Sequence, residues 1–378
     1  MEPYGVTIFT EITNLAVAHN AINLGQGFPD WDGPKFIKEA AINSMAVGGN
    51  DQYPPSPGIL PLREAIAARY SPRLGRNLDP TSEITVTAGC TEALTSVFQG
   101  LVNAGEEIIL IEPYYDSYPV GLSLVDAVPR YVTLRPPEFR LDLDELRAAF
   151  NPRTKAILIN TPHNPTGRVF DQEELQAIAD LCLEYGSIAI CDEVYEDITY
   201  DKKHLHLAAF DGMADRTITL SSLGKTFSLT GWKVGWSIAS EELSQGLRAA
   251  HQFLTFTTPT PVQHGAIAAM ETPAFYYEDL RVSYKTKRDL LVSGLERVGI
   301  LPFVPEGTYF VLADHTAVGF ADDRMFCRAL IEKAGVAAIP PSSFYHDSSD
   351  GANLVRFAFC KDETSISEAI NRMEQYLG

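Results

Sequence analysis

The chain has 378 residues, which is longer than a domain with a single hydrophobic core usually is. Of these residues, 45% are hydrophobic. Its formal net charge of -19 argues against a nucleic-acid or anionic-membrane partner, because the summed field repels phosphate. The N-terminus lacks a leader pattern, no apolar run reaches membrane-spanning length, and the five cysteines contain no C-x-x-C pair. We therefore expect a cytoplasmic protein with reduced thiols, no membrane association and no metal site.

Helix and strand signals alternate between residues 30 and 270. Helices are expected over 34–45, 60–70, from 91 onward, and over 117–124, 143–150 and 172–185. Strands are expected over 83–87, 107–111, 130–134, 155–160, 188–191 and 216–220. This alternation predicts a largely parallel sheet wrapped by helices.

After residue 271 the pattern changes. A long polar helix is expected over 273–298, strands near 308–313 and 354–359, and further helices near 324–333 and 365–376. We interpret this region as a smaller α+β domain.

A turn rich in glycine, serine and lysine follows the strand at 216–220. In such a turn Lys225 can be partly desolvated, and Lys233 can serve as a neighbouring cation, so the pKa of Lys225 falls and its amine becomes a nucleophile. The segment also fits the S-x-x-K pattern of serine acyl-enzymes, but the companion S-D-N and K-T-G motifs are absent. An exposed turn with solvated lysines remains the alternative.

Three other strands end in polar residues, where an open α/β sheet places its ligands. After the first, Gly89 permits a tight turn before a helix whose free N–H groups suit a phosphate, although a plain helix cap would look the same. Asn164 follows the second, within a turn. Asp192 ends the third, and such a buried carboxylate requires a partner of opposite charge.

The histidine pair His204 and His206 lies beside Asp201, Lys202 and Lys203. This setting favours an exposed loop over a metal site.

One ligand explains all four strand ends. Pyridoxal phosphate (PLP) needs a lysine for its aldehyde, a phosphate cradle, a carboxylate for its ring nitrogen and donors to its phenolic oxygen. The joint pattern is more specific than any of its parts.

The chain resembles the fold-type I PLP-dependent aminotransferases of class I/II, in the kynurenine, glutamine-phenylpyruvate and methionine aminotransferase branch. The motifs that carry this resemblance are spread over nearly the whole chain: Asn23–Asp30, Asn164–Gly167, Asp192–Tyr195, Ser222–Lys225, Gly231–Trp236 and Val355–Phe357. It implies the PLP-dependent transferase fold, an α/β fold with a mostly parallel seven-stranded sheet flanked by helices. It also implies three parts: an N-terminal arm (1–30) belonging to the small domain, a large PLP-binding domain (31–270) and a small C-terminal domain (271–378).

The resemblance assigns roles around the cofactor ring. Lys225 forms the Schiff base (the internal aldimine) and Asp192 pairs with the pyridinium nitrogen. Asn164 and Tyr195 bond the phenolic oxygen, and Tyr115 stacks on the ring. Lys225, Asp192 and Tyr195 are the expected catalytic residues.

The phosphate is expected to lie against Gly89, Cys90 and Thr91, with Ser222 and Lys233 completing the cradle. Lys233 stands where aspartate aminotransferases have an arginine, so a point charge replaces a fork. Cys90 stands where glycine or alanine is common, and nothing in the sequence explains it.

The substrate carboxylate is expected to bind Arg356 as a bidentate fork, near Gly27, Asn160 and Asn164. Phe9 would line the side-chain pocket. No second arginine is evident for a distal carboxylate, which weakens an aspartate-specific interpretation.

The family is dimeric with shared active sites, so the resemblance implies a homodimer in which Tyr53, at the cofactor, and Phe256, at the substrate, reach the partner's site.

The expected reaction is transamination between a 2-oxo acid and an L-amino acid with an aromatic, sulfur-containing or glutamine-like side chain. Cysteine S-conjugate β-elimination remains an alternative, because it uses the same residues. N-succinyl-diaminopimelate transamination is another, because enzymes similar in Gly25–Gly27 and Val355–Phe357 are assigned to it. A cofactor-binding regulator would need a DNA-binding extension, and a non-catalytic binding protein would not need Lys225.

Overall fold

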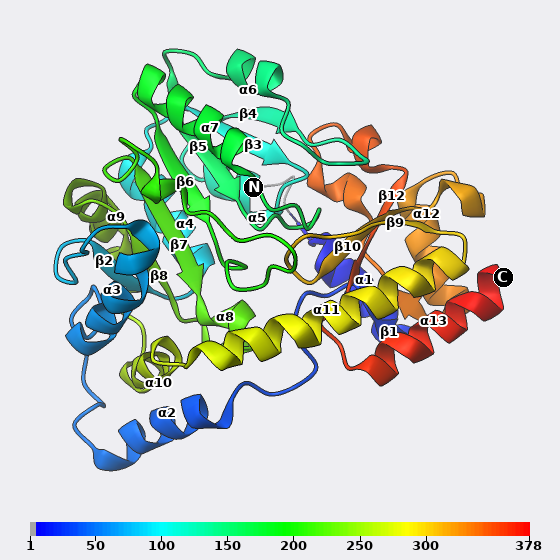
Figure 1. The fold of residues 1–378 in the computed structure, drawn as a ribbon, viewed down its shortest axis with the longest axis horizontal. Coiled ribbons are helices and arrows are strands. Elements are labelled where there is room, and N and C mark those ends of the chain that lie inside the picture. The colour runs from blue at the N-terminus through cyan, green and yellow to red at the C-terminus, as the bar shows by residue number, and fades with distance from the viewer. Residues whose placement is uncertain (1–4) are drawn as a thin grey trace.

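The structure, a computed structural model, describes residues 5–378 (Figure 1). At its centre is a seven-stranded sheet with strand order β2-β8-β7-β6-β5-β3-β4. Strand β8 runs antiparallel to β2 and β7, whereas the other neighbouring pairs are parallel, so the predicted mostly parallel sheet is confirmed. The strands are β2 (Ile84–Thr87), β3 (Glu107–Glu112), β4 (Val128–Thr133), β5 (Thr154–Asn160), β6 (Ile188–Asp192), β7 (Thr217–Ser222) and β8 (Gly235–Ile238).

Helices connect and flank these strands. They are α2 (Lys35–Val47), α3 (Leu60–Leu74), α4 (Cys90–Leu101), α5 (Ser117–Ser123), α6 (Leu143–Ala149), α7 (Gln172–Tyr185), α8 (Leu223–Thr226), α9 (Glu241–Leu254) and α10 (Thr260–Met270). Helix α7 shows why its sequence is helical: Asp171 and Glu174 form a capping box at its start, and Gly186 ends it in the left-handed conformation. Helices α9 and α10 were not among the expected elements.

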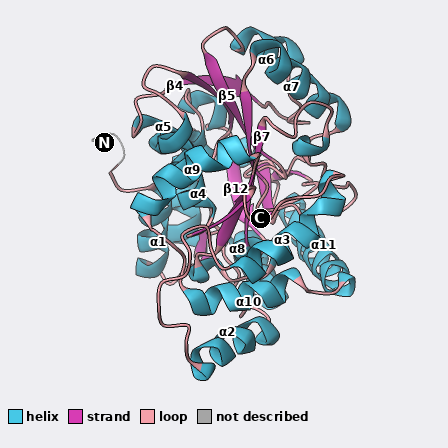
Figure 2. Ribbon diagram, turned by 90° about the vertical axis from the view of Figure 1, so that its left-hand side faces the viewer, coloured by secondary structure: helices cyan, strands magenta, loops and turns pink. Residues whose placement is uncertain are grey.

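Side chains alternate along each strand, so every strand contributes residues to both faces of the sheet. Each face is covered by its own hydrophobic core. In β3, Ile109 and Ile111 belong to the core that α6 and α7 cover, whereas Ile108 and Leu110 belong to the core under α4, α5 and α9. Figure 2 shows the sheet between α4 and α9 on one side and α7 on the other. The β-branched runs that predicted strands are therefore continuous apolar runs of a doubly covered sheet.

A smaller group of elements combines the two ends of the chain. An antiparallel sheet has the order β12-β10-β9, and β1 pairs in parallel with β11, which joins the N-terminal segment to the C-terminal one. The elements are α1 (Ile8–Ala18), β1 (Ile22–Asn23), α11 (Ala274–Arg297), β9 (Leu301–Phe303), β10 (Phe310–Asp314), α12 (Asp323–Ala329), β11 (Val336–Ala337), β12 (Leu354–Ala358) and α13 (Glu363–Leu377). One π-helical turn (Leu330–Ala334) continues α12.

Helix α11 packs on both groups of elements. Tyr276 stacks on Phe227 near its start, while Tyr284, Leu291 and Leu295 join the core of the antiparallel sheet. A domain boundary at residue 270 and an arm ending at residue 30 stay predictions, and residues 1–4 of that arm lie outside the described part of the chain.

Within residues 5–378, no helix is long and apolar enough to cross a membrane. The five cysteines are free thiols.

Candidate active site

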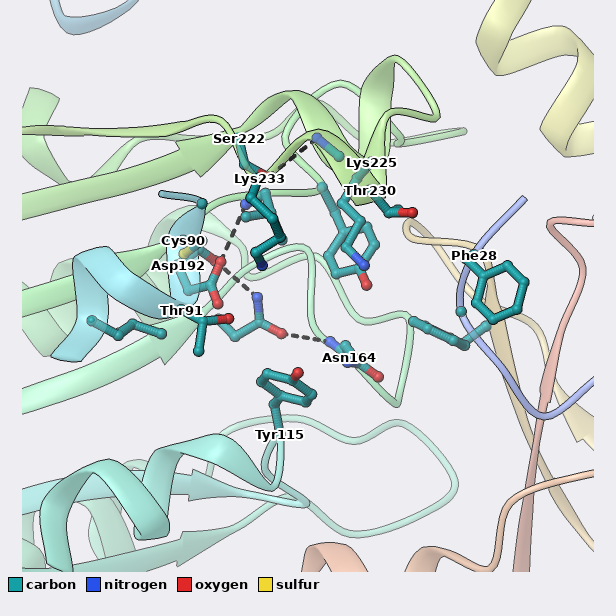
Figure 3. A pocket seen from close by; sticks show the side chains of 18 of the residues that line it. Phe28, Cys90, Thr91, Tyr115, Asn164, Asp192, Ser222, Lys225, Thr230 and Lys233 are labelled. Carbon is teal, nitrogen blue, oxygen red and sulfur yellow. Dashed lines mark hydrogen bonds between the residues drawn. The ribbon is translucent and has the colours of Figure 1, made fainter. Parts of the chain in front are cut away.

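A cavity of about 360 Å³ opens where β5, β6 and β7 end, between the start of α4 and strand β12. Figure 3 shows Cys90, Asp192 and Lys233 toward one end of this cavity and Phe28 at the other. All but two of the predicted site residues line it: Phe9, Gly27, Gly89, Cys90, Thr91, Tyr115, Asn160, Asn164, Asp192, Tyr195, Ser222, Lys225, Lys233 and Arg356.

The two exceptions are Tyr53 and Phe256, which were expected to reach a partner's site. They are 85% and 44% exposed, and their rings meet edge to face with centroids 5.4 Å apart. The described chain therefore presents them on its own surface, away from its own cavity.

Lys225 belongs to the short helix α8, which directly follows β7. Its Nζ lies 5.6 Å from the ring centroid of Tyr195 and 5.8 Å from that of Tyr309. Burial lowers the pKa of Lys225, and the charges of Lys233 and Arg356 lower it further. The expected role of Lys233 as a second cation beside Lys225 thus agrees with the direction of the shift. A larger fraction of this amine is therefore neutral at a given pH than on an exposed lysine.

Asp192 ends β6 and is 5% exposed. One carboxylate oxygen accepts a hydrogen bond from the Tyr118 hydroxyl at 2.8 Å, and the other accepts from the Val194 backbone N–H at 3.3 Å. Burial raises the pKa of this carboxyl group, while these donors oppose the rise. The sequence predicted a partner of opposite charge for Asp192, but its hydrogen-bond donors are neutral groups. A cationic ligand would stabilise this buried carboxylate, so the site favours one beside Asp192.

Cys90 lines the same cavity beside this carboxylate. Burial raises the pKa of its thiol well above the usual range, and the nearby charge of Asp192 adds to the rise. The group therefore remains a thiol, and its closeness to Asp192 opposes the rise in the pKa of that carboxyl group. This contact gives Cys90 a structural role that the sequence did not reveal.

The start of α4 forms an open cradle. Gly89 has φ +82°, and no side chain caps the helix, so the N–H groups of its first turn are free for an anion. A Cβ atom on Gly89 would lie 3.1 Å from Lys233 Nζ, which shows how closely this lysine approaches the turn. Ser222, Thr91 and Lys233 line the same end of the cavity. The donor set suits a phosphate group.

Arg356 lies in β12 and is 2% exposed. Its guanidinium donates to Asn164 Oδ1 at 3.1 Å and to the Gly25 carbonyl at 2.8 Å, while Nε has no partner. Burial lowers its pKa to about 10. No ion pair to this guanidinium is formed within residues 5–378. A buried cation without an anion is costly, so the site is built for an anionic ligand.

Aromatic rings enclose the guanidinium. The Arg356 Cζ atom lies 4.2 Å from the ring centroid of Phe310 and 5.2 Å from those of Phe9 and Phe344. These rings attract the cation and keep water away from it. Gly27 permits this packing, because a Cβ there would come within 2.5 Å of the Phe310 ring.

The remaining predicted residues fix the loop after β5. Asn160 accepts from the Asn164 N–H at 2.7 Å and donates to the Asp192 carbonyl at 2.8 Å. Burial raises the pKa of Tyr195, and it raises that of Tyr115 to about 12, so both phenols stay protonated at neutral pH. Tyr195 is therefore available as a hydrogen-bond donor, and Tyr115 contributes a neutral ring.

Sequence reasoning missed several lining residues, notably Tyr118, Phe310, Gln26, Phe28 and Thr230. Tyr118 lies in α5, three residues after Tyr115, which precedes that helix, and its hydroxyl meets a carboxylate 74 residues further along the chain. The two rings meet edge to face with centroids 5.7 Å apart, and their closeness in sequence was the signal that could have found Tyr118. The hydrogen bond itself depends on tertiary packing.

The prediction of an exposed loop for His204 and His206 was wrong. Their side chains are only 4% and 8% exposed, and they contact the fully buried carboxylate of Glu193. The charged residues beside them lie at the surface, whereas the two rings turn inward.

Comparison with known proteins agrees with this geometry. The family model "Aminotransferase class I and II" matches residues 19–373. A solved N-succinyldiaminopimelate aminotransferase from Mycobacterium tuberculosis superposes with a TM-score of 0.96 at 46% identity, covering 99% of this chain and 98% of that one.

Two further relatives align over nearly the whole chain. The methionine aminotransferase of Escherichia coli is 41% identical over 98% of this chain and 96% of its own length. The kynurenine–oxoglutarate transaminase of Dictyostelium discoideum is 39% identical over 97% and 93%. The chain therefore belongs to the class I and II aminotransferase family and is a PLP-dependent aminotransferase.

Proposed function

We propose that this enzyme binds PLP in the cavity and exchanges an amino group between a 2-oxo acid and an L-amino acid with an aromatic, sulfur-containing or glutamine-like side chain. The observation that carries the proposal is Arg356: a buried guanidinium without an acidic partner, enclosed by aromatic rings, in the same cavity as the half-buried Lys225. A 2-amino or 2-oxo acid supplies the carboxylate that this cation lacks.

The residues present fit the cofactor. The uncapped start of α4 with Ser222 and Lys233 would hold the phosphate, and Asp192 would hold the proton of the ring nitrogen. A cationic ring nitrogen offsets the burial that now raises the pKa of Asp192. Tyr115 offers a ring face, and Asn164 and Tyr195 offer donors for the phenolic oxygen. When bound, PLP supplies an electron sink for the carbanion that forms at the substrate Cα.

The protein's own contribution is orientation and proton transfer. Arg356 fixes the substrate carboxylate, which directs the Cα–H bond toward Lys225. The lowered pKa of Lys225 favours its neutral amine, which can accept this proton and later return it. Burial keeps water from the transferred proton and strengthens both charge contacts.

The side-chain pocket favours large apolar groups. Phe9, Phe28, Tyr115 and Phe310 line the cavity that also holds the Arg356 guanidinium. The cationic side chains lining the cavity are Lys225, Lys233 and Arg356, and each has a role in the scheme above. Within the described chain no cation is left for a second substrate carboxylate.

A screen of amino donors tests this substrate class. Holoenzyme is assayed with phenylalanine, methionine, kynurenine, glutamine and aspartate, with 2-oxoglutarate as acceptor. We expect kcat/KM for the first four to exceed that for aspartate at least tenfold. Equal or better use of aspartate would refute the proposal. Pyruvate and ammonia release from a cysteine S-conjugate is measured alongside, since β-elimination uses the same lysine.

N-succinyl-diaminopimelate transamination is the second candidate, because a solved relative with that name superposes with a TM-score of 0.96. Its substrate carries further carboxylates, for which the described cavity offers no free cation. Adding N-succinyl-L,L-diaminopimelate to the screen separates the two candidates. A kcat/KM for it more than tenfold above every other donor would favour the second.

We also propose a homodimer with shared sites. Tyr53, Phe253 and Phe256 are exposed by 85%, 86% and 44%, and Phe256 keeps a positive φ of 66° while presenting its ring to solvent. Exposed aromatic rings held in fixed positions mark an interaction surface. A second copy covering this surface would receive Tyr53 and Phe256 at its own cavity.

A further inference from the structure

A second cluster of ligating side chains lies behind the end of β6. Glu193 follows Asp192 in the chain but does not line the active-site cavity. Glu193 Oε2 lies 2.5 Å from His206 Nδ1 and 3.2 Å from His204 Nε2. One ligand atom from each of the three residues lies within 4.8 Å of the other two. Both rings contact the same carboxylate oxygen. They stand nearly perpendicular to each other, at 88°, with centroids 4.6 Å apart.

Some polar atoms of this cluster are unpartnered in the interior. The Glu193 side chain is fully buried, and its Oε1 atom accepts no hydrogen bond. His204 Nδ1 is also buried without a hydrogen-bond partner. Such groups cost free energy unless a ligand satisfies them.

A second carboxylate faces the far side of His206. His206 Nε2 lies 3.9 Å from Glu196 Oε2. Glu196 is held in turn by Arg73 at 2.9 Å, by the Ser221 hydroxyl at 2.9 Å and by the Tyr70 hydroxyl. Metal-binding histidines commonly direct their second nitrogen at an anchored carboxylate, which fixes the tautomer of the ring.

We propose that Glu193, His204 and His206 bind a divalent first-row transition metal, with Zn²⁺ the ion that two imidazoles and one carboxylate suit best. The ion displaces the proton shared between Glu193 and His206, which leaves to solvent. Tetrahedral ligands stand ~3.3 Å apart, so the Glu193–His206 contact widens on binding. Water completes the coordination.

The cluster lies beneath a surface segment of the chain. Asp201 and Lys203 are exposed, while the rings that follow them turn inward. Because Glu193 adjoins Asp192, a bound ion anchors the chain behind the active-site carboxylate without entering the cavity. The site is thus independent of the proposed amino-acid specificity.

Zinc titration of the holoenzyme tests the proposal, with calorimetry after chelator treatment. We expect one Zn²⁺ per chain, at least tenfold weaker binding for both His204→Gln and His206→Gln, and unchanged binding for His19→Gln, a surface control. Far-UV circular dichroism confirms that each variant is folded. Wild-type affinity in both cluster variants would overturn the site and leave an ordinary histidine–glutamate pair.

A second measurement locates the ion independently of the variants. Crystals of the zinc-loaded holoenzyme are measured at the zinc absorption edge. An anomalous peak between Glu193, His204 and His206 supports the proposal. A peak elsewhere, for example at Cys90, or no peak at all refutes it.

Discussion

The guanidinium of Arg356 shows how a single residue can serve substrate binding at the expense of stability. It is buried, and within residues 5–378 only neutral groups contact it. Burial lowers its pKa to about 10, yet it stays charged at neutral pH. Removing a charge that lacks a partner relieves a desolvation cost in the substrate-free protein.

We therefore expect Arg356→Gln to lower kcat/KM for amino acids at least about 30-fold while leaving the thermal stability of the substrate-free enzyme equal or higher. Steady-state kinetics and thermal unfolding measure the two effects. Arg328→Gln, which changes a guanidinium in an exposed i, i+4 pair, is the matched control and should alter neither. Loss of stability with intact kcat/KM would show that Arg356 is structural.

Lys225 and Lys233 differ in burial and surroundings, so their replacement should have different effects. Lys225 lies against two tyrosine rings, whereas Lys233 is exposed at the turn beside Gly89. We expect Lys225→Ala to lower kcat by a factor of about 10² to 10⁴ or more, because the proton acceptor is lost. Its lysine-linked cofactor absorbance should also disappear. Lys233→Ala should weaken PLP binding, and saturating PLP should largely restore turnover. Near-normal transamination by Lys225→Ala would contradict the mechanism.

At the scale of elements, the sequence predicted six of the seven strands of the large sheet, whereas β8 (Gly235–Ile238) was not among the expected strands. Their apolar β-branched runs are buried on both faces, so local composition and tertiary environment agree. Helices α1, α9 and α10 were not recognised. Their signals were present, since Ile8, Ile12 and Ala16 recur at helical spacing and are buried.

The site was predictable to the extent that its residues follow strands. Asp192 ends β6, and Lys225 follows the end of the neighbouring parallel strand β7, so their closeness follows from topology. The contacts of Tyr118 and Cys90 with Asp192 depend on how α4 and α5 pack on the sheet. The inward turn of His204 and His206 was equally invisible, because charged neighbours in sequence suggested an exposed segment.

The cradle at the start of α4 permits a controlled test of a glycine. Gly89 and Gly48 share nearly the same backbone, with φ +82° and ψ 170° against φ +79° and ψ 173°. A Cβ on Gly89 meets Lys233 at 3.1 Å, whereas nothing lies within 4 Å of one on Gly48. Both Gly→Ala changes should cost about 1–3 kcal/mol of stability, because this backbone region is essentially restricted to glycine.

We expect only Gly89→Ala to weaken PLP binding, by at least tenfold, because it crowds the phosphate cradle. Equilibrium dialysis of the cofactor and thermal unfolding separate the two effects. Equal PLP affinity in both variants would argue that the phosphate lies elsewhere.

For the whole molecule, the sign of the net charge is opposite to that of most charged side chains lining the cavity. The chain carries a formal charge of -19, yet three cations line the cavity. A negative protein that binds anionic ligands must concentrate its positive charge in one place. The net negative charge also repels a second copy of the chain unless apolar contacts compensate. The exposed aromatic rings of Tyr53, Phe253 and Phe256 could supply such contacts.

We expect the wild-type protein to be a dimer at micromolar concentration by analytical ultracentrifugation, and Phe256→Asp to be largely monomeric. Leu301→Asp, at a residue 61% exposed in β9, is the control and should remain dimeric. If sites are shared, the monomer also loses PLP affinity, and Tyr53→Phe should weaken PLP binding without changing the dimer. A monomeric wild type with full activity would contradict both the dimer and the roles of Tyr53 and Phe256, because each chain would then form a complete site alone.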